Sequence, residues 1–233
     1  MSDLGTFGVA LVRADNPGPY SLSGTNTWIY GSDPAWVVDP GPLLPEHQEA
    51  VALEVEARGG AGGIAVTHSH ADHVEGVEAL VARLGGDVPV AHGSSIGPLE
   101  AMPLPGHSDD HAVFVAGRVA FTGDAVLGEG SVFVIGRLGE YLDGLRRLRA
   151  LDLALLCPGH GPPVWDPAAK LDGYVAHRLD RERRLVDALA RGLRTEDELL
   201  DAAWPDAPPV LREAAAMSLR AHMEKLEAEG RVP

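Results

Sequence analysis

The stretch Thr67–His73 restricts the fold of this chain more than any other part of the sequence, because three histidines and one aspartate fall within six residues. A short apolar run precedes it, so we expect the stretch to lie on a loop at the end of a β-strand. On such a loop His68 and His70 point to the same side, as alternate residues do. Asp72 and His73 follow at the start of a helix. The pattern therefore indicates two adjacent transition-metal positions rather than one.

Three further polar residues repeat this setting, since each follows an apolar run and has a glycine beside it. They are His107, Asp124 and His160. Glycine lets the backbone approach closely, and layered α/β folds place their ligands on loops at strand ends. Imidazole suits Zn²⁺, Fe and Mn, and a carboxylate can bridge two cations about 3.5–4 Å apart. The sequence therefore predicts a metal centre whose ligands come from separate segments.

In this order and with these glycine neighbours, the residues resemble the metal-binding motifs of the metallo-β-lactamase fold superfamily. Further motifs are similar to those of one branch, the β-lactamase-like protein 2 group, whose animal mitochondrial member is an endoribonuclease. These motifs are Asn16–Pro19, Gly24–Thr27, Val38–Pro42, Gly106–His111, Gly123–Gly130, Ala176–Arg178 and Ser218–Gly230. The resemblance extends over nearly the whole chain. It implies an α/β (α+β) fold, an αββα sandwich followed by a small helical, winged-helix-like module.

The resemblance also implies a metal-dependent hydrolase with two Zn²⁺ per chain, Fe or Mn being the alternatives. It divides the ligands as His68, His70 and His107 for the first ion, Asp72, His73 and His160 for the second, and Asp124 as the bridge. A water between two such cations is activated near neutral pH, because the cations stabilise its negatively charged form. The activated water would attack a carbonyl or phosphorus centre.

Asp72, Asp124 and His111 are the candidate catalytic residues. Asp72 would orient the attacking water, and Asp124 would hold the two ions together. His111 would either support a ligand through a hydrogen bond or donate a proton to the leaving group, and the first role is the commoner one. Asp39, at the end of an early strand, is expected to support a histidine ligand. His92 has no assigned role.

Local patterning predicts a catalytic domain over residues 1–166. Strands are expected at residues 7–12, 27–30, 35–38, 64–66, 88–91, 112–115, 118–121 and 153–156, and helices at 46–58, 74–84 and 139–148. Two half-sheets with helices outside accommodate this order, and the ligand loops then line one edge between the sheets. The segment from Ala91 to His107 is short beside the family that the chain resembles, so one wall of the cleft should be low.

Residues 167–233 predict a second, helical domain, with helices over 171–191, 195–204 and 208–230. Thr195 and Glu198 have the spacing of a capping box. In the resembled module a β-wing follows the last helix, and we expect that wing to be missing or truncated here. We expect the module to pack over the metal cleft and shape it, with DNA binding as the alternative.

The formal net charge of −15 is unevenly distributed. Residues 1–169 carry eight Lys and Arg against twenty-one Asp and Glu, whereas residues 170–233 carry eleven against thirteen. Such an acidic body is unlike a duplex-binding surface, so duplex DNA is not an expected partner. A local arginine cluster is interleaved with Asp180 and Glu182, which indicates a solvated helix face with internal pairing. The cluster consists of Arg178, Arg181, Arg183 and Arg184.

No apolar stretch reaches the roughly 18–20 residues that span a bilayer, and the first residues do not resemble a signal peptide. We therefore expect no membrane partner and a cytoplasmic location. The single cysteine, Cys157, excludes an internal disulfide and fits a reducing compartment. Cys157 should be a small buried side chain rather than a ligand. The oligomeric state is open, a homodimer included.

Two enzymatic functions compete at this stage. One is a phosphodiesterase, in particular an endoribonuclease on single-stranded RNA, and the other is a glyoxalase II-like thioesterase or other acyl hydrolase acting on a small ester or thioester. The acidic charge favours the second, because it disfavours large nucleic acids. A non-enzymatic role for the helical module is disfavoured by the complete set of candidate ligands.

Overall fold

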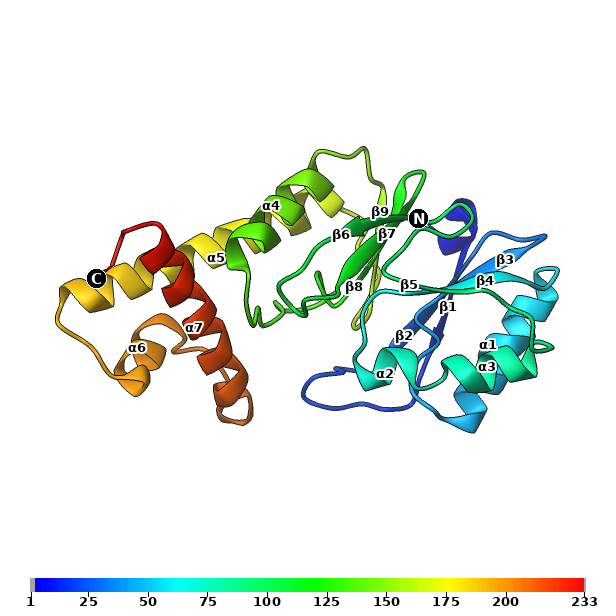
Figure 1. The fold of residues 1–233 in the computed structure, drawn as a ribbon, viewed down its shortest axis with the longest axis horizontal. Coiled ribbons are helices and arrows are strands. Elements are labelled where there is room, and N and C mark those ends of the chain that lie inside the picture. Colours follow the sequence, from blue (N-terminus) through cyan, green and yellow to red (C-terminus); the bar gives the residue numbers. More distant parts are fainter. Residues whose placement is uncertain (1–2, 233) are drawn as a thin grey trace.

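Two β-sheets face each other at the centre of the structure, a computed structural model that describes residues 3–232 (Figure 1). The strands of the first sheet, in spatial order, are β1 (Val9–Arg13), β2 (Asn26–Tyr30), β3 (Ala35–Val38), β4 (Ala61–Val66) and β5 (Val90–His92). Those of the second are β6 (Glu100–Pro103), β7 (Ala112–Ala116), β8 (Val119–Gly123) and β9 (Leu155–Pro158). Each sheet is thus built from one continuous part of the chain, and a site between the sheets draws on both parts.

Parallel strand pairs determine where the ligand loops lie. β3 and β4 run parallel to each other, and so do β8 and β9. The carboxyl ends of parallel strands meet at one edge of a sheet, which is where such folds bind ligands. The loops after β3 and β4 therefore lie together on the first sheet, and the loops after β8 and β9 lie together on the second.

Apolar side chains from both sheets fill the space between them. Trp28 of β2 meets Phe114, Phe121 and Leu155 of the second sheet, and all four are fully buried. The indole Nε1 of Trp28 also donates a hydrogen bond to the carbonyl oxygen of Pro158, at 2.9 Å. This bond satisfies a buried donor and connects the first sheet to the end of β9.

Helices cover the outer face of each sheet, which confirms the predicted αββα sandwich. α1 (Pro45–Ala57) and α3 (Val77–Arg83) pack on the first sheet, and α4 (Leu138–Arg149) with the first half of α5 (Pro167–Ala190) packs on the second (Figure 1). The shorter elements are η1 (Leu4–Phe7), α2 (Ala71–Val74) and η2 (Pro209–Leu211). Within residues 3–232, no helix combines the length and the apolar character needed to cross a membrane.

The second half of α5 extends beyond the sandwich and packs against α6 (Glu196–Ala203) and α7 (Arg212–Ala228). The predicted capping box is present, because the Thr195 hydroxyl accepts from the Glu198 amide and the Glu198 carboxylate accepts from the Thr195 amide. α5 contributes Tyr174 to the sandwich core and Leu185 to the C-terminal core. Because α5 contributes side chains to both cores, the predicted domain boundary after residue 166 stays a prediction.

Three elements differ from the sequence-based expectation. β6 was not predicted, and it pairs antiparallel with β7 at the edge of the second sheet. The first strand begins only at Val9, because the residues before it form η1 and end in Gly8 with a φ of 68°. The helix expected over residues 74–84 is broken, since the Gly76 amide donates to the carbonyl of Gly41 instead of continuing the helix.

The prediction of a solvated, internally paired arginine cluster on α5 is confirmed for two of its four residues and wrong for the other two. Arg183 and Arg184 do pair with Asp180 on an accessible helix face. Arg178 and Arg181 are buried instead, with exposed fractions of 1% and 5%. The physical reason is that α5 runs between the sandwich and the C-terminal helices, which cover one of its faces.

We predict that Phe121→Ala lowers the free energy of unfolding by about 3–5 kcal/mol, because it leaves a cavity between the two sheets. Denaturant unfolding followed by circular dichroism measures this change. Leu151→Ala is the control, since Leu151 is 43% exposed. Equal stability of the two variants would contradict this packing between the sheets.

Candidate metal centre

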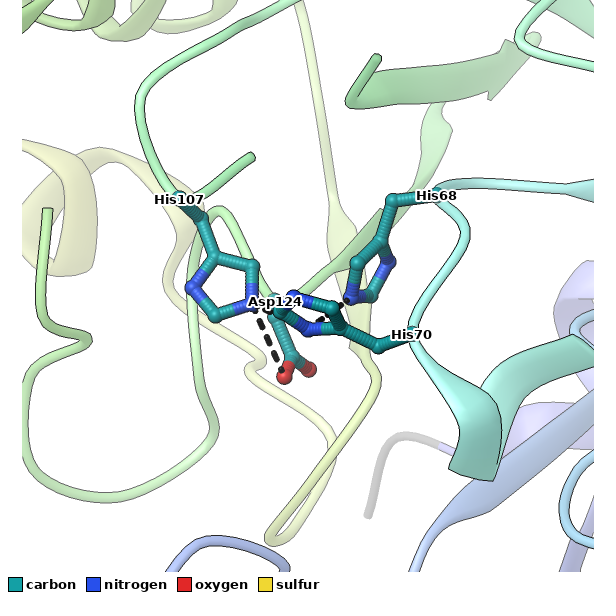
Figure 2. A group of neighbouring side chains, drawn as sticks. All are labelled: His68, His70, His107 and Asp124. Atoms are coloured by element: carbon teal, nitrogen blue, oxygen red, sulfur yellow. Dashed lines mark hydrogen bonds and ion pairs between the residues drawn. The ribbon is translucent and has the colours of Figure 1, made fainter. Parts of the chain in front are cut away.

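Four of the predicted ligands converge from three loops (Figure 2). The Nδ1 atom of His70 lies 3.0 Å from the Nε2 atom of His68 and 3.0 Å from the Nε2 atom of His107. The Oδ2 atom of Asp124 lies 3.6 Å from the Nε2 atom of His107. One donor atom of each residue lies within 4.8 Å of all the others, so the four side chains can share one cation.

A second group lies beside the first and consists of Asp72, His73 and His160. The Oδ2 atom of Asp72 is 3.6 Å from the Nε2 atom of His73 and 3.4 Å from that of His160. Asp124 reaches this group as well, with Oδ1 3.5 Å from His73 Nε2 and Oδ2 3.2 Å from His160 Nε2. The structure thus brings all seven predicted ligands together, with Asp124 between the two groups.

Two buried polar atoms test whether these residues fit metal ions. The Nε2 atom of His73 and the Oδ1 atom of Asp124 are buried, and neither has a hydrogen-bond partner within residues 3–232. A buried polar group without a partner is costly, and both atoms face the space between the ligand groups. Imidazole nitrogen and carboxylate oxygen are the donors that Zn²⁺, Fe and Mn accept. The donor set therefore fits two adjacent cations.

Burial keeps two of the histidines neutral. It lowers the pKa of His68 far below the usual range of an imidazole, and it also lowers the pKa of His107. A neutral imidazole is the form that binds a metal ion. For Asp124 burial acts in the opposite direction and raises the pKa, but the neighbouring His73 and His160 outweigh it, so the carboxyl is ionised.

The ring of His73 lies between two carboxylates. Burial lowers its pKa, but Asp124 and Asp39 together outweigh burial and hold the pKa well above that of a free histidine. The surroundings of His73 therefore favour positive charge. A cation at the Nε2 side of the ring satisfies the same electrostatic preference.

Asp39 supports the centre from the end of β3, as expected. Its Oδ2 atom lies 2.9 Å from the Nδ1 atom of His73 and accepts a hydrogen bond from the Thr67 hydroxyl at 2.8 Å. Its Oδ1 atom accepts from the Thr67 amide at 2.7 Å. The same Thr67 hydroxyl lies 2.9 Å from the Nδ1 atom of His68. One aspartate and one threonine thus orient a ligand of each group.

His111 lies behind the ligands rather than in front of them. Its Nε2 atom accepts a hydrogen bond from the Asp124 amide at 3.1 Å, and its ring stacks on that of His68 at 4.8 Å between centroids. Burial lowers the pKa of His111 to about 3, so the ring is neutral. His111 is 1% exposed and does not line the cavity beside the ligands, and it contacts the backbone amide of Asp124.

Sequence reasoning gave no role to two residues that orient Asp72. The Thr25 hydroxyl donates to the Oδ2 atom of Asp72 at 2.8 Å. The Asn16 side chain in turn donates to the Thr25 hydroxyl and accepts from the Thr25 amide, both at 2.9 Å. Both residues belong to motifs quoted for the family resemblance. Their contact with Asp72 was not visible, because 47 residues separate Thr25 from it.

The side chain of Asn26 holds the loop that carries His160. Its Nδ2 atom donates to the carbonyls of Pro158 and Gly161, both at 2.9 Å. The remaining histidines lie elsewhere. His92 is exposed at the end of β5, whereas His47 and His222 are buried by packing.

A cavity of about 1120 Å³ opens onto the two ligand groups. Residues 16–22 form one wall, residues 127–135 a second, and α5 with residues 204–217 the rest. None of residues 93–106 lines it. His177 of α5 also lines the cavity.

The segment Leu127–Ile135 contacts one ligand of each group. The Gly128 amide donates to the carbonyl of His160 at 2.8 Å. The carbonyl of Phe133 lies 3.5 Å from the Nδ1 atom of His107, which fixes the direction of that ring. This wall of the cavity is therefore also part of the support of the centre.

The same segment is attached to the C-terminal helices on its other side. The Leu127 amide donates to the Tyr174 hydroxyl of α5 at 2.8 Å. Ser218 of α7, which is fully buried, exchanges two hydrogen bonds of 2.9 Å with the backbone of Val134. The helical module thus contacts the centre through one loop.

Comparisons with known proteins agree with this fold. Residues 86–160 match the Metallo-beta-lactamase superfamily, and residues 195–233 match the Beta-lactamase associated winged helix domain. The beta-lactamase-like protein 2 homolog of Caenorhabditis elegans is 28% identical over 255 residues, which cover 95% of this chain and 85% of that protein. The lactamase-like protein nscB of Trichophyton rubrum is 32% identical over 226 residues, covering 82% of this chain and 67% of that protein.

Solved structures show the same fold. A metallo-beta-lactamase family protein from Thermus thermophilus superposes with a TM-score of 0.72 at 22% identity, over 96% of this chain and 94% of that one. The fold and the ligand groups define a metal-dependent hydrolase of the αββα type. The chain belongs to the metallo-β-lactamase superfamily.

We predict that Gly159→Ala removes metal from the centre. A Cβ atom at this position would lie 2.4 Å from the Oδ1 atom of Asp124 and 2.7 Å from the Cε1 atom of His73, so both side chains must move. Metal analysis of the purified protein should show a lower content per chain. Gly139→Ala is the control, because a Cβ atom there meets no atom within 4 Å. Full metal content in Gly159→Ala would refute this close approach.

We predict that Thr25→Val weakens metal binding at the Asp72 group about 10–100-fold, the usual effect of losing a hydrogen bond to a ligand. Valine keeps the shape of threonine but cannot donate to Asp72. Titration against a competing chelator measures the two affinities separately. Thr6→Val, at an exposed position, should leave both affinities unchanged. An unaltered affinity in Thr25→Val would mean that Asp72 needs no such support.

Proposed function

We propose that this chain is a dinuclear metal-dependent hydrolase of carboxylic esters or thioesters that carry an apolar acyl part. The cavity above the two ligand groups is the observation that supports this substrate class. Its lining is mainly apolar and includes Leu22, Phe133, Trp204, Leu211 and Met217. Pockets of this volume and character bind small molecules, with a few polar groups fixing their orientation.

The alternative substrate, single-stranded RNA, is less well matched by the charges. Proteins that bind single strands combine a positively charged groove with aromatic stacking surfaces. This chain has a formal net charge of −15. Arg220, on the last helix, is already paired with Glu196 at 2.9 Å. We therefore infer that the C-terminal helices form a wall of the substrate cavity and do not bind nucleic acid.

Two metal ions at these residues would supply an activated water and polarise the carbonyl of the substrate. Asp72 is the ligand carboxylate most open to the cavity, with a third of its side chain exposed against a tenth for Asp124. We assign Asp72 the orientation of the attacking water and Asp124 the alignment of the two ligand groups. His111 keeps Asp124 in place through its backbone amide.

The donor atoms of the two ligand groups suit several metal ions. We propose Zn²⁺ as the resident ion, because imidazole and carboxylate donors suit it. Iron is the alternative, since a protein that is 25% identical and superposes with a TM-score of 0.53, over 68% of this chain and 96% of that one, was solved in a di-iron-bound form. We further propose a cytoplasmic location, in keeping with the single reduced cysteine.

We predict that the metal-loaded protein hydrolyses S-octanoyl-N-acetylcysteamine faster than S-lactoylglutathione, bis-p-nitrophenyl phosphate or single-stranded RNA. Metal analysis of the same sample should give about two ions per chain, as in other two-metal sites. Cleavage of RNA without thioester hydrolysis would overturn the proposed substrate class in favour of the phosphodiesterase. Folded protein without bound metal would overturn the dinuclear centre itself.

We predict that Asp124→Asn lowers kcat at least about 100-fold, because electrostatic stabilisation of this kind is worth that much in other enzymes. Circular dichroism should show an unchanged fold. Asp152→Asn is the matched control, since Asp152 is 85% exposed and far from the centre in the fold. Unchanged turnover in Asp124→Asn would remove Asp124 from the catalytic centre.

A further inference from the structure

One face of α5 adds positive charge to the mainly apolar cavity. Lys170, Tyr174, His177, Arg178 and Arg181 all line it, at the spacing of one helix face. Gly173 lies on the same wall and leaves room beside these side chains, since nothing lies within 4 Å of its missing Cβ atom. In a chain with a net charge of −15, this concentration of cations beside the catalytic centre calls for a physical reason.

Arg178 is the most unusual of these residues. It is only 1% exposed, and no carboxylate of residues 3–232 forms an ion pair with it. Its Nη2 atom donates to the Ser131 hydroxyl at 2.7 Å and to the carbonyl of Val132. Its Nε atom is buried and has no hydrogen-bond partner in the described chain. A buried guanidinium is costly unless a counter-ion compensates it.

Arg181, one turn further along the helix, also has a buried Nε atom without a hydrogen-bond partner in the described chain, but its charge is compensated by a carboxylate. Its guanidinium pairs with the carboxylate of Asp206 at 2.7 Å and lies over the ring of Trp204. Arg178 has its hydrogen bonds to Ser131 and Val132 and the ring of Tyr141, with 6.0 Å between the guanidinium carbon and the ring centroid, but no carboxylate among residues 3–232. The comparison indicates that the counter-ion of Arg178 comes from outside the chain.

One further cation, Lys170, and one neutral imidazole, His177, lie on the same wall, since burial lowers the pKa of His177 to about 4. The Nζ atom of Lys170 donates to the carbonyl of Gly128 at 3.1 Å and lies over the Tyr174 ring. The ring of His177 lies 3.4 Å from the Ser131 hydroxyl, which also contacts Arg178. The acidic residues that line the cavity outside the metal centre are Glu129, Asp206 and Glu213, and of these Asp206 is already paired with Arg181.

We propose that the α5 wall binds an oxyanion, a carboxylate or phosphate group that the substrate carries away from the bond to be cleaved. Arg178 is the centre of this subsite, with Lys170 and His177 beside it. The inference rests on the proposed acyl hydrolase and adds a preference, among substrates of the same apolar length, for esters or thioesters with a negatively charged end. Arginine is the side chain best suited to such groups, because its planar fork matches their geometry.

The backbone relates this subsite to the reacting centre. Consecutive carbonyls point to the two places, since that of Val132 accepts from Arg178 and that of Phe133 faces His107. An anion at Arg178 would therefore fix the far end of a substrate whose carbonyl lies at the metal ligands. Such fixing at two points orients the reacting bond and raises kcat/KM for the correct substrate.

The test compares p-nitrophenyl esters of matched chain length whose far end is a methyl, a carboxylate or a phosphate group. The carboxylate esters run from glutarate to sebacate, and each is compared with the methyl and phosphate esters of the same length. We expect wild-type kcat/KM to favour a charged ester by about tenfold or more, the net value of a charge-assisted hydrogen bond. Arg178→Gln should abolish that preference. The ratio of two kcat/KM values from one sample does not depend on the fraction of folded protein, so partial unfolding does not obscure the result.

Lys170→Gln is the second variant, should Arg178→Gln fail to fold, and it should reduce the preference in the same direction. Arg183→Gln is the matched control, because Arg183 is 70% exposed on the other side of α5. Equal rates for neutral and charged esters in the wild type would overturn the subsite while leaving the acyl hydrolase intact. Hydrolysis of none of the esters would instead overturn the proposed function.

Binding of octyl phosphate, measured by calorimetry, tests the subsite without any turnover. We expect Arg178→Gln to weaken binding about tenfold, the effect of one charge-assisted hydrogen bond, and Arg183→Gln to leave it unchanged. Binding of equal strength in wild type and Arg178→Gln would assign the phosphate to another place, such as the metal centre, and would overturn the proposal.

Discussion

Hydrogen bonds that cross from the first sheet to the end of β9 align the two candidate ligand groups. Asn26 and Trp28 of β2 both donate to the carbonyl of Pro158, directly before the loop that carries His160. The ligands are divided between the two halves of the sandwich, with Thr67–His73 on one and Asp124 and His160 on the other. Ligand geometry tolerates errors of only a few tenths of an ångström, so the two sheets must be held in register. The apolar core between them supplies the adhesion, and these directional bonds supply the alignment.

The candidate ligands could be predicted from the sequence, because four of them fall within Thr67–His73 and the other three each follow an apolar run and have a glycine beside them. Residues that act through tertiary contact could not. Thr25 orients Asp72 only after the chain has folded, and the burial of Arg178 depends on helices that lie on either side of α5. β6 escaped notice because it lies at the edge of its sheet, where an exposed glutamate and a proline obscure the strand pattern.

Superfamily membership fixes the chemistry of the centre more tightly than it fixes the substrate. The sandwich supplies the ligands and their support, such as the aspartate at the end of β3. The walls of the cavity come from other parts, namely residues 16–22 and the C-terminal helices. These walls can change without disturbing the metal ligands, which is how one fold serves many substrates. The acidic body and the cationic face of α5 lie outside the metal ligands, and they are the features that bear on the substrate of this particular chain.

The segment Leu127–Ile135 has a mechanical consequence. It touches His107 and His160 on one side and is attached to Tyr174 and Ser218 on the other. A displacement of the helical module would therefore move this segment, and with it the contacts to one ligand of each group. A shortened chain ending before α5 would lose one wall of the cavity. It would also lose the contacts that hold the segment beside His107 and His160, so the orientation of these two ligands would be less well defined. The helical module thus both lines the cavity and, through this segment, supports one ligand residue of each group.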